Sequence, residues 1–295
     1  SSNAALVMCA RGARNQVSSV HEKQLEEIYT CFERLRVRPL AERKAPRRGP
    51  EPAALKAPKA LTLPEGLRDW FVNRGVQGLP QWCAATQADE QQLCRHVVAL
   101  HRLGVPPFFR EQLQPLIMKL FVSLEARVPS ARIPADDARR AEFWPELKDS
   151  LVRLAVPAMA EVVFELFGRS SSLVVVLDAS GWSPAAGHWK VSQRICFVDV
   201  AVSLDTARRA RGMLVRRLER ACRAGGFAEG GLAAGLIEDW ERAVDERALQ
   251  RGAAPRLAFC DAAHGSPPLP EGRPLLPLAL LQATAGAAGG AVELQ

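Results

Sequence analysis

The chain has 295 residues, 48% of them hydrophobic, so it can bury a sizeable core in one large domain or two smaller ones. Its formal charge of +7 favours an anionic partner, such as nucleic acid or an acidic lipid surface. GC-rich coding would produce a similar excess of Arg, Ala, Gly and Pro, so charge alone does not identify the partner. No run approaches the roughly 20 apolar residues of a membrane helix, so no membrane span is expected.

The seven cysteines are scattered along the chain, odd in number and without a Cys-x-x-Cys pair. This pattern argues against a disulfide framework and indicates an intracellular, reducing compartment. Residues 1–19 contain two arginines and no acidic residue, as in the remnant of a mitochondrial transit peptide. Residues 2–4 also resemble an expression-tag scar. A mitochondrial location is therefore the expectation from this end of the chain.

The first predicted element is an amphipathic helix over 20–36, where apolar side chains recur three or four residues apart. Residues 38–64 contain six prolines and many Lys and Arg, which predicts an extended basic arm. This arm is either a solvated linker or a segment that binds a phosphate backbone or a protein partner. Helices are expected over 65–103, up to a stop at Gly104.

A short strand is predicted at 117–124, followed by a long helix at about 143–167 that is kinked by Pro157 and capped by Gly168. Two apolar, β-branched runs then predict strands at 173–178 and 191–202.

A helix is expected from Asp205 onward, another over 231–250, and a strand over 256–263. The mixture indicates the α/β (α+β) class, with a mixed sheet flanked by helices. We expect three parts: an N-terminal helix and arm at 1–64, a main domain at 65–280, and a low-complexity tail at 281–295.

The stretch Lys190-Val191-Ser192-Gln193-Arg194 places two cations and a hydroxyl at alternate positions where a strand begins. Because side chains alternate between the faces of a strand, Lys190, Ser192 and Arg194 project from the same face. Two cations beside a hydroxyl form a suitable cradle for a phosphate. An edge strand with a polar face is the plainer interpretation of the same pattern.

These residues also resemble a family. The segment LDASGWSPAAGHWKVSQR, residues 177–194, resembles a segment of eukaryotic primase-polymerases, in the archaeo-eukaryotic primase superfamily. That segment runs Leu-Asp-Ser-Ser, a loop, and Lys-x-Ser-x-His. Residues 120–125 resemble the family's first motif, an apolar strand that ends in Asp-x-Glu or Asp-x-Asp. Residues 259–261, with Arg273 beyond a loop, are similar to its third motif, an Asp on a strand followed by an Arg that contacts nucleotide.

The resemblance implies that Lys190, Ser192, Arg194 and Arg273 hold the phosphates of a nucleotide. It also implies a primase-polymerase-like mixed sheet over roughly 110–280. An active member would be a nucleotidyltransferase, a DNA-directed primase or polymerase acting in DNA replication.

Catalysis in this family would place Mg²⁺ or Mn²⁺ on Glu125 and Asp261. The first motif's Asp position is Ser123 here, and a hydroxyl is a poor substitute for a carboxylate around a hard cation. Arg194 stands where the family has His, and a guanidinium stays protonated. These departures predict a degenerate catalytic site, a pseudoenzyme fold kept for binding.

Arginines also recur at helical spacing in the helix that follows. They could form a basic stripe against a nucleic-acid backbone, or simply a solvated helix face. The stripe would consist of Arg209, Arg216, Arg220 and Arg223.

Three functions follow. The first is a catalytically degenerate, primase-polymerase-like protein that binds DNA or RNA and acts as a structural subunit of a larger nucleoprotein or ribonucleoprotein assembly, with no cofactor expected. The second is an active primase-polymerase using Mg²⁺ or Mn²⁺ with a third, unidentified carboxylate. The third is an α/β adapter that contacts only protein.

Overall fold

We describe the fold from a computed structural model of the chain. It divides into two compact units, and each is described by itself: an N-terminal unit of residues 1–113 and 254–270, and a C-terminal unit of residues 114–253 and 271–295. The structure describes the following residues: 19–37, 70–73, 81–83, 86–104, 109–112, 117–183, 186–223, 231–237, 239–250, 253, 255–261, 263–264, 269–270, 272–285 and 293–294. The predicted arm at 38–64 and residues 1–18 lie outside them.

The N-terminal unit contains two helices, a small antiparallel sheet ordered β1-β3-β2-β4, and a pair of short strands, β9 and β10. Helix α2 confirms the predicted amphipathic helix, because its apolar residues join those of α4 in one buried cluster around Ile28 and Leu93. The elements are α2 (Ser19–Leu35), β1 (Arg36–Val37), β2 (Trp70–Asn73), β3 (Gln81–Cys83), α4 (Gln87–Arg102), β4 (Phe109–Gln112), β9 (Ala263–His264) and β10 (Leu269–Pro270).

Two sequence-based assignments in this unit are wrong. Residues 70–73 form β2 and not part of a helix, because a short apolar run does not distinguish a strand from a helix turn. Residues 257–260 form a turn and not a strand: the Cys260 amide donates to the Leu257 carbonyl, and Phe259 adopts φ 62°. Cys260 is buried in the cluster with α2 and α4, so packing explains the apolar run that predicted a strand.

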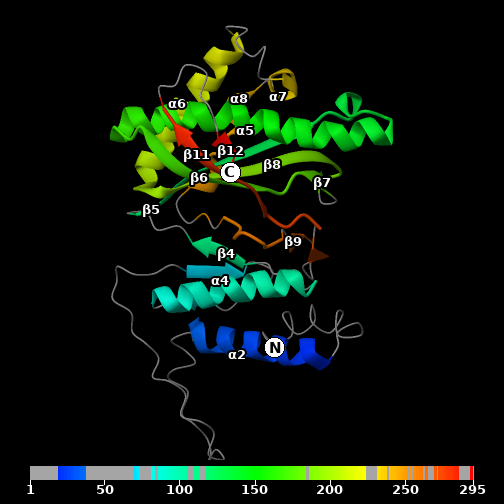
Figure 1. Cartoon of the computed structure of the whole chain (residues 1–295), viewed down its shortest axis with the longest axis vertical. Helices are drawn as coiled ribbons and strands as arrows, with labels where there is room; N and C mark the ends of the chain where they lie inside the picture. Colours follow the sequence, from blue (N-terminus) through cyan, green and yellow to red (C-terminus); the bar gives the residue numbers. More distant parts are fainter. Residues whose placement is uncertain are drawn as a thin grey trace, which may run out of the picture. The chain divides into compact units, whose positions relative to one another are not determined.

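The C-terminal unit is built on an antiparallel sheet with strand order β12-β11-β6-β8-β5, and β7 pairs with β8 (Figure 1). The antiparallel sheet flanked by helices confirms the α+β class, whereas the expectation of a mixed sheet is wrong, because every described strand pair of this unit is antiparallel. The predicted strands are present, and each is longer than its apolar run. The strands are β5 (Met118–Val128), β6 (Ser171–Asp178), β7 (Gly181–Ser183), β8 (His188–Val202), β11 (Leu276–Thr284) and β12 (Glu293–Leu294).

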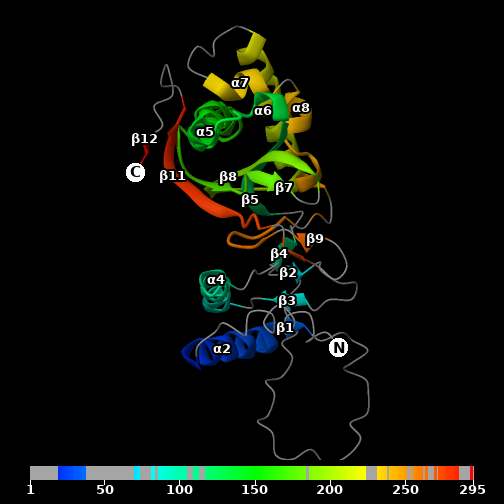
Figure 2. The same cartoon turned by 90° about the vertical axis from the view of Figure 1, so that its right-hand side faces the viewer.

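Helices α5 (Asp137–Phe167) and α6 (Leu204–Arg223) lie against one face of this sheet (Figure 2). The Asp136 carboxylate caps the start of α5, and Gly168 ends it in the left-handed conformation that glycine adopts without strain. Ile195 and Phe197 of β8 are fully buried on this face, which makes it the core of the unit.

The predicted helix over 231–250 is wrong as a single element. It is divided into α7 (Gly231–Leu236), α8 (Trp240–Ala243) and the 3₁₀ turn η2 (Arg247–Leu249), with the Asp239 carboxylate capping a new start. Between α8 and η2, Val244 forms a β-bridge with Leu124 of β5.

The unit boundaries differ from the three expected parts, since β11 runs across residue 280. Among the described helices, none combines the length and the apolar character of a membrane span.

Candidate phosphate-binding site

Strands β5 and β8 together present one polar face, opposite the helices. β8 begins at His188 and so includes the whole predicted cradle. In the antiparallel register, Arg194 lies opposite Ser123, Ser192 opposite Glu125, and Lys190 opposite Arg127. Because directly paired residues share a face, these six side chains line the same side of the sheet. The sheet therefore brings the predicted cradle beside the predicted first motif.

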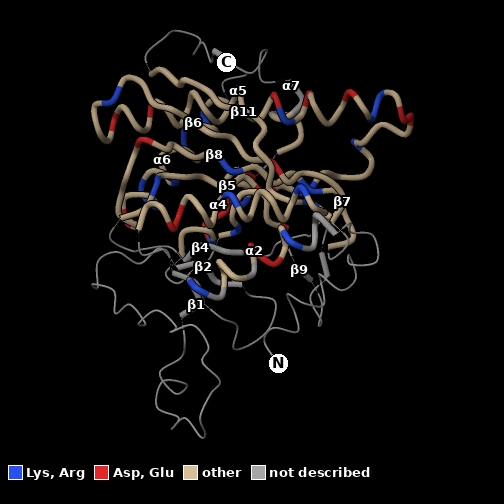
Figure 3. The backbone as a smooth tube through the Cα atoms, turned by 60° about the horizontal axis from the view of Figure 1, so that its bottom comes forward, with Lys and Arg blue, Asp and Glu red and all other residues tan. Residues whose placement is uncertain are grey.

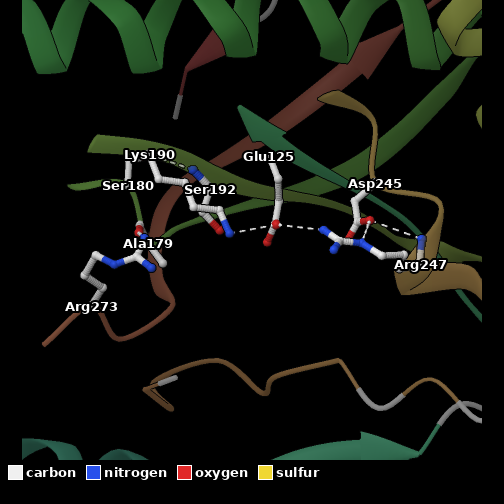
Figure 4. A network of polar contacts seen from close by, with 8 residues as sticks. All are labelled: Glu125, Ala179, Ser180, Lys190, Ser192, Asp245, Arg247 and Arg273. Carbon is white, nitrogen blue, oxygen red and sulfur yellow. Dashed lines mark hydrogen bonds and ion pairs between the residues drawn. The ribbon is translucent and has the colours of Figure 1, made fainter. Parts of the chain in front are cut away.

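Glu125 lies at the centre of an ionic network on this face (Figure 4). Its Oε2 is 2.7 Å from Lys190 Nζ and 3.7 Å from Arg247 Nη2. Arg247 also contacts Asp245 at 3.0 Å, and this hydrogen bond raises the pKa of the guanidinium above its ordinary value. Glu125 thus neutralises Lys190 of the predicted cradle together with Arg247, which the cradle did not include.

Hydrogen bonds join the turn after β6 to strand β8. The Ala179 amide donates to the Ser192 carbonyl (2.8 Å), and the Ser192 amide donates to Ser180 Oγ (3.0 Å). Ser180 in turn donates to the Asp178 carboxylate, whose other oxygen is 2.6 Å from Lys148 Nζ. These bonds hold the backbone of Ser192 in place beneath the cradle.

Arg273, expected to contact nucleotide, is buried and donates from Nη1 to the Ala179 carbonyl at 2.9 Å (Figure 4). In this position it supports the turn. The side chain packs close to Gly181, where an added Cβ would lie 3.5 Å from Arg273 Cδ and the backbone φ of +152° disfavours other residues.

Arg194 has a different partner from Lys190. Its Cζ lies 5.2 Å from the centre of the Phe121 ring, within the range of a cation–π contact. Phe121 precedes Ser123 by two residues on β5 and so lies on the same face. The two cations of the cradle are therefore held by different partners, Lys190 by Glu125 and Arg194 over an aromatic ring.

The two predicted metal-ligand positions of this unit, Ser123 and Glu125, supply a single carboxylate. Ser123 is buried, and its hydroxyl has no hydrogen-bond partner among the described residues. Glu125, the one predicted carboxylate in this unit, is engaged by two cations. Across the described part of the chain, no group of three or more His, Cys, Asp or Glu side chains is arranged to hold a metal.

Asp261 belongs to the N-terminal unit, whereas Ser123 and Glu125 belong to the C-terminal unit. It is buried, follows the turn at 257–260 instead of ending a strand, and lies 3.9 Å from Arg256 Nη1. Its role as a metal ligand stays a prediction.

The arginines of α6 fall into two sets (Figure 3 marks the basic positions). Arg208, Arg211 and Arg217 are tied to neighbouring segments by hydrogen bonds and ion pairs. The four arginines of the predicted stripe are all exposed, and only Arg223 pairs with a carboxylate among the described residues, Glu219 at 3.6 Å. At 100° per residue, Arg209, Arg216, Arg220 and Arg223 lie within an arc of about 60°.

Sequence reasoning missed Arg247 and Arg127. The predicted helix over 231–250 includes Arg247, whereas in the structure this residue begins the separate turn η2. A capping Asp239 within the segment was the available signal. Arg127 lay beyond the predicted strand, although alternation continues to buried Val128.

No protein-family model matches the chain, and no curated protein matches it in sequence. The likeness to the primase superfamily stays a prediction from its motifs.

Proposed function

We propose that this chain is a primase-polymerase-like, nucleic-acid-binding protein with a degenerate catalytic site, which acts as a structural subunit of a larger nucleoprotein assembly. The α6 stripe contacts the phosphodiester backbone, and the β5–β8 face binds a phosphate group. The mitochondrial location remains part of this proposal and rests on the composition of residues 1–19.

The observation that supports nucleic-acid binding is the division of the α6 arginines. If GC-rich coding alone explained these arginines, paired and unpaired ones would be distributed at random around the helix. Instead, three are bonded to neighbouring segments of the fold, and four lie on one exposed face where, among the described residues, a single carboxylate pairs with one of them. A row of unneutralised cations on a helix favours binding to a regularly spaced row of phosphates.

Two features support degenerate catalysis. The position expected to supply a second carboxylate beside Glu125 is a buried hydroxyl, Ser123. Glu125 is paired with Lys190 and Arg247, so a divalent cation would have to compete with two resident cations. Both features are compatible with a protein that binds nucleic acid but does not catalyse nucleotide transfer.

The test is nucleic-acid binding as a function of salt. For the purified full chain we expect log K to fall linearly with log salt, on both duplex DNA and RNA probes. Arg216→Ala/Arg220→Ala should weaken binding and reduce the magnitude of the slope by about 2, since each lost phosphate contact removes about 1. Fluorescence anisotropy from 50 to 300 mM KCl measures both quantities.

The matched control is Arg139→Ala/Arg153→Ala, which removes the same charge from exposed positions of α5. It should leave the slope within error of the wild-type value. Equal losses in both double variants would show that net charge, and not the stripe, determines affinity.

Two outcomes would replace the proposal. No binding at low salt would leave the protein-only adapter. Template-dependent nucleotide incorporation with Mg²⁺ or Mn²⁺ that disappears in Asp261→Ala would establish the active primase-polymerase instead.

A further inference from the structure

One carboxylate occupies the place on the β5–β8 face where a bound anion would be expected. Glu125 Oε2 is shared by Lys190 Nζ at 2.7 Å and Arg247 Nη2 at 3.7 Å, which approach it from opposite sides in Figure 4. The Lys190 and Glu125 side chains are only 24% and 28% exposed. Solvent therefore screens this pair less than it screens an open surface pair.

The two carboxylates of the network are not equivalent. Asp245 has a short side chain that is 15% exposed and contacts Arg247 at 3.0 Å, within its own segment. Its backbone amide also donates to the Ser123 carbonyl at 2.8 Å, which fixes the residue. Glu125 has a longer side chain on the strand itself and makes its contacts through one carboxylate oxygen. Glu125 is thus the group that can move away without breaking the backbone contacts.

We propose that Glu125 is the internal counter-ion of the phosphate site, and that it restricts the site to phosphate groups with at least two negative charges. Such a ligand displaces the carboxylate from Lys190 and Arg247. This inference rests on the proposed function and deepens it, because it names the ligand class of the β5–β8 face.

The selectivity follows from competition. A tethered carboxylate is present at an effective concentration of millimolar or more, whereas a free anion must be recruited from solution. If a monoanion displaced Glu125, one negative charge would replace another beside Lys190 and Arg247, and no Coulomb energy would be gained. A dianion or polyanion makes stronger, charge-assisted hydrogen bonds to the same cations.

This charge requirement predicts different ligands for the α6 stripe and for the β5–β8 face. An internal phosphodiester carries a single charge and should bind the α6 stripe. A terminal phosphate monoester, with a charge of about −1.5 to −2 at neutral pH, or a polyphosphate chain should bind beside Lys190.

The experiment measures binding of inorganic triphosphate and of monoanionic dimethyl phosphate to the full chain, by isothermal titration calorimetry with EDTA present. Wild type should bind triphosphate and show no measurable binding of dimethyl phosphate. Glu125→Gln should bind triphosphate roughly tenfold more tightly, an effect within the usual range of coupling between competing sites, and should begin to bind dimethyl phosphate. Lys190→Gln should lose triphosphate binding.

Two further variants serve as controls. Glu125→Asp keeps the charge and should retain the wild-type preference. Glu161→Gln removes a carboxylate that pairs with Arg217, away from this network, and should bind both probes as wild type does. Should Glu125→Gln fail to fold, the wild-type preference between the two probes still tests the charge rule.

Equal binding of both probes by wild type, or unchanged or weaker triphosphate binding in Glu125→Gln, would overturn the counter-ion role. The titration of triphosphate is repeated with Mg²⁺ in place of EDTA, and weaker binding by Glu125→Gln under that condition alone would also overturn the counter-ion role, in favour of a metal ligand. These results are independent of the salt slope on duplex, so the inference can fail while the proposed function stands. A nucleoside triphosphate and a 5′-phosphorylated oligonucleotide then distinguish the two sources of the ligand, and preference for either supports the charge rule.

Discussion

The two sides of helix α6 use the same residue type in opposite ways. On the inner side, buried Arg211 donates to the Val244 and Glu241 carbonyls and to the Glu241 carboxylate. On the outer side, Arg216 and Arg220 are exposed and pair with no carboxylate in the described part of the chain. The difference shows that the number of arginines in a helix does not indicate a binding surface; their partners do.

The largest effect is expected when Arg211, on the inner side of α6, is replaced. Arg211→Ala leaves two backbone carbonyls without their donor and should lower the free energy of unfolding by about 2–4 kcal/mol. Urea denaturation followed by circular dichroism measures the loss. Arg209→Ala, on the outer side of the same helix, is the control and should change stability by less than about 0.5 kcal/mol. Similar losses in both variants would refute the distinction between the two sides.

A smaller effect is expected for Arg217, which joins α6 to α5 through Glu161 and Glu165. Because all three side chains are at least 32% exposed, Arg217→Ala should cost only about 0.5–1 kcal/mol. The difference from wild type should shrink in 1 M NaCl, where these charges are screened. A loss that is unaffected by salt would mean that Arg217 acts by packing.

The N-terminal unit contains a buried titratable atom, His96 Nε2, without a hydrogen-bond partner among the described residues. Burial lowers the pKa of the ring below 6.5, with Glu27 opposing and Arg34 reinforcing the shift. The unfolded chain therefore binds the proton at higher pH than the folded one.

The contribution of neutral His96 to the free energy of unfolding should accordingly be fully present above pH 6.5. It should decrease as the pH drops below 6.5 toward the lower pKa of the folded state. His96→Gln, which does not titrate, should lose this part of the pH dependence. Urea denaturation at pH 7.5, 6.5 and 5.5 compares the two proteins. A pH dependence shared by both would assign the effect to carboxylates instead.

The elements that were predictable from sequence are those in which local pattern and tertiary packing agree. Helix α5 has a capping Asp136, a terminal Gly168 and a long apolar pattern, and the side chains of β8 alternate between the two faces from His188 to Phe197, before the bulge that follows. The same-face arrangement of Lys190, Ser192 and Arg194 follows from that alternation alone.

The elements that were mispredicted are those in which packing overrides pattern. Residues 231–250 keep a helical apolar spacing, but Val244 bonds to β5 and interrupts the helix. The apolar residues at 257–260 pack against helices instead of pairing with a strand. The ion pair between Glu125 and Arg247 could not be predicted from the sequence, because Arg247 lies 122 residues away in that interrupted segment.

The bridge between Leu124 and Val244 has a further consequence. β5 is the last strand of its sheet, and an open strand edge is a template on which a second chain can add a strand. The bridge, with the Asp245 amide bound to the Ser123 carbonyl, covers the middle of that edge with the protein's own backbone. The segment that delivers Arg247 to the polar face therefore also protects the sheet against aggregation through β-strand addition.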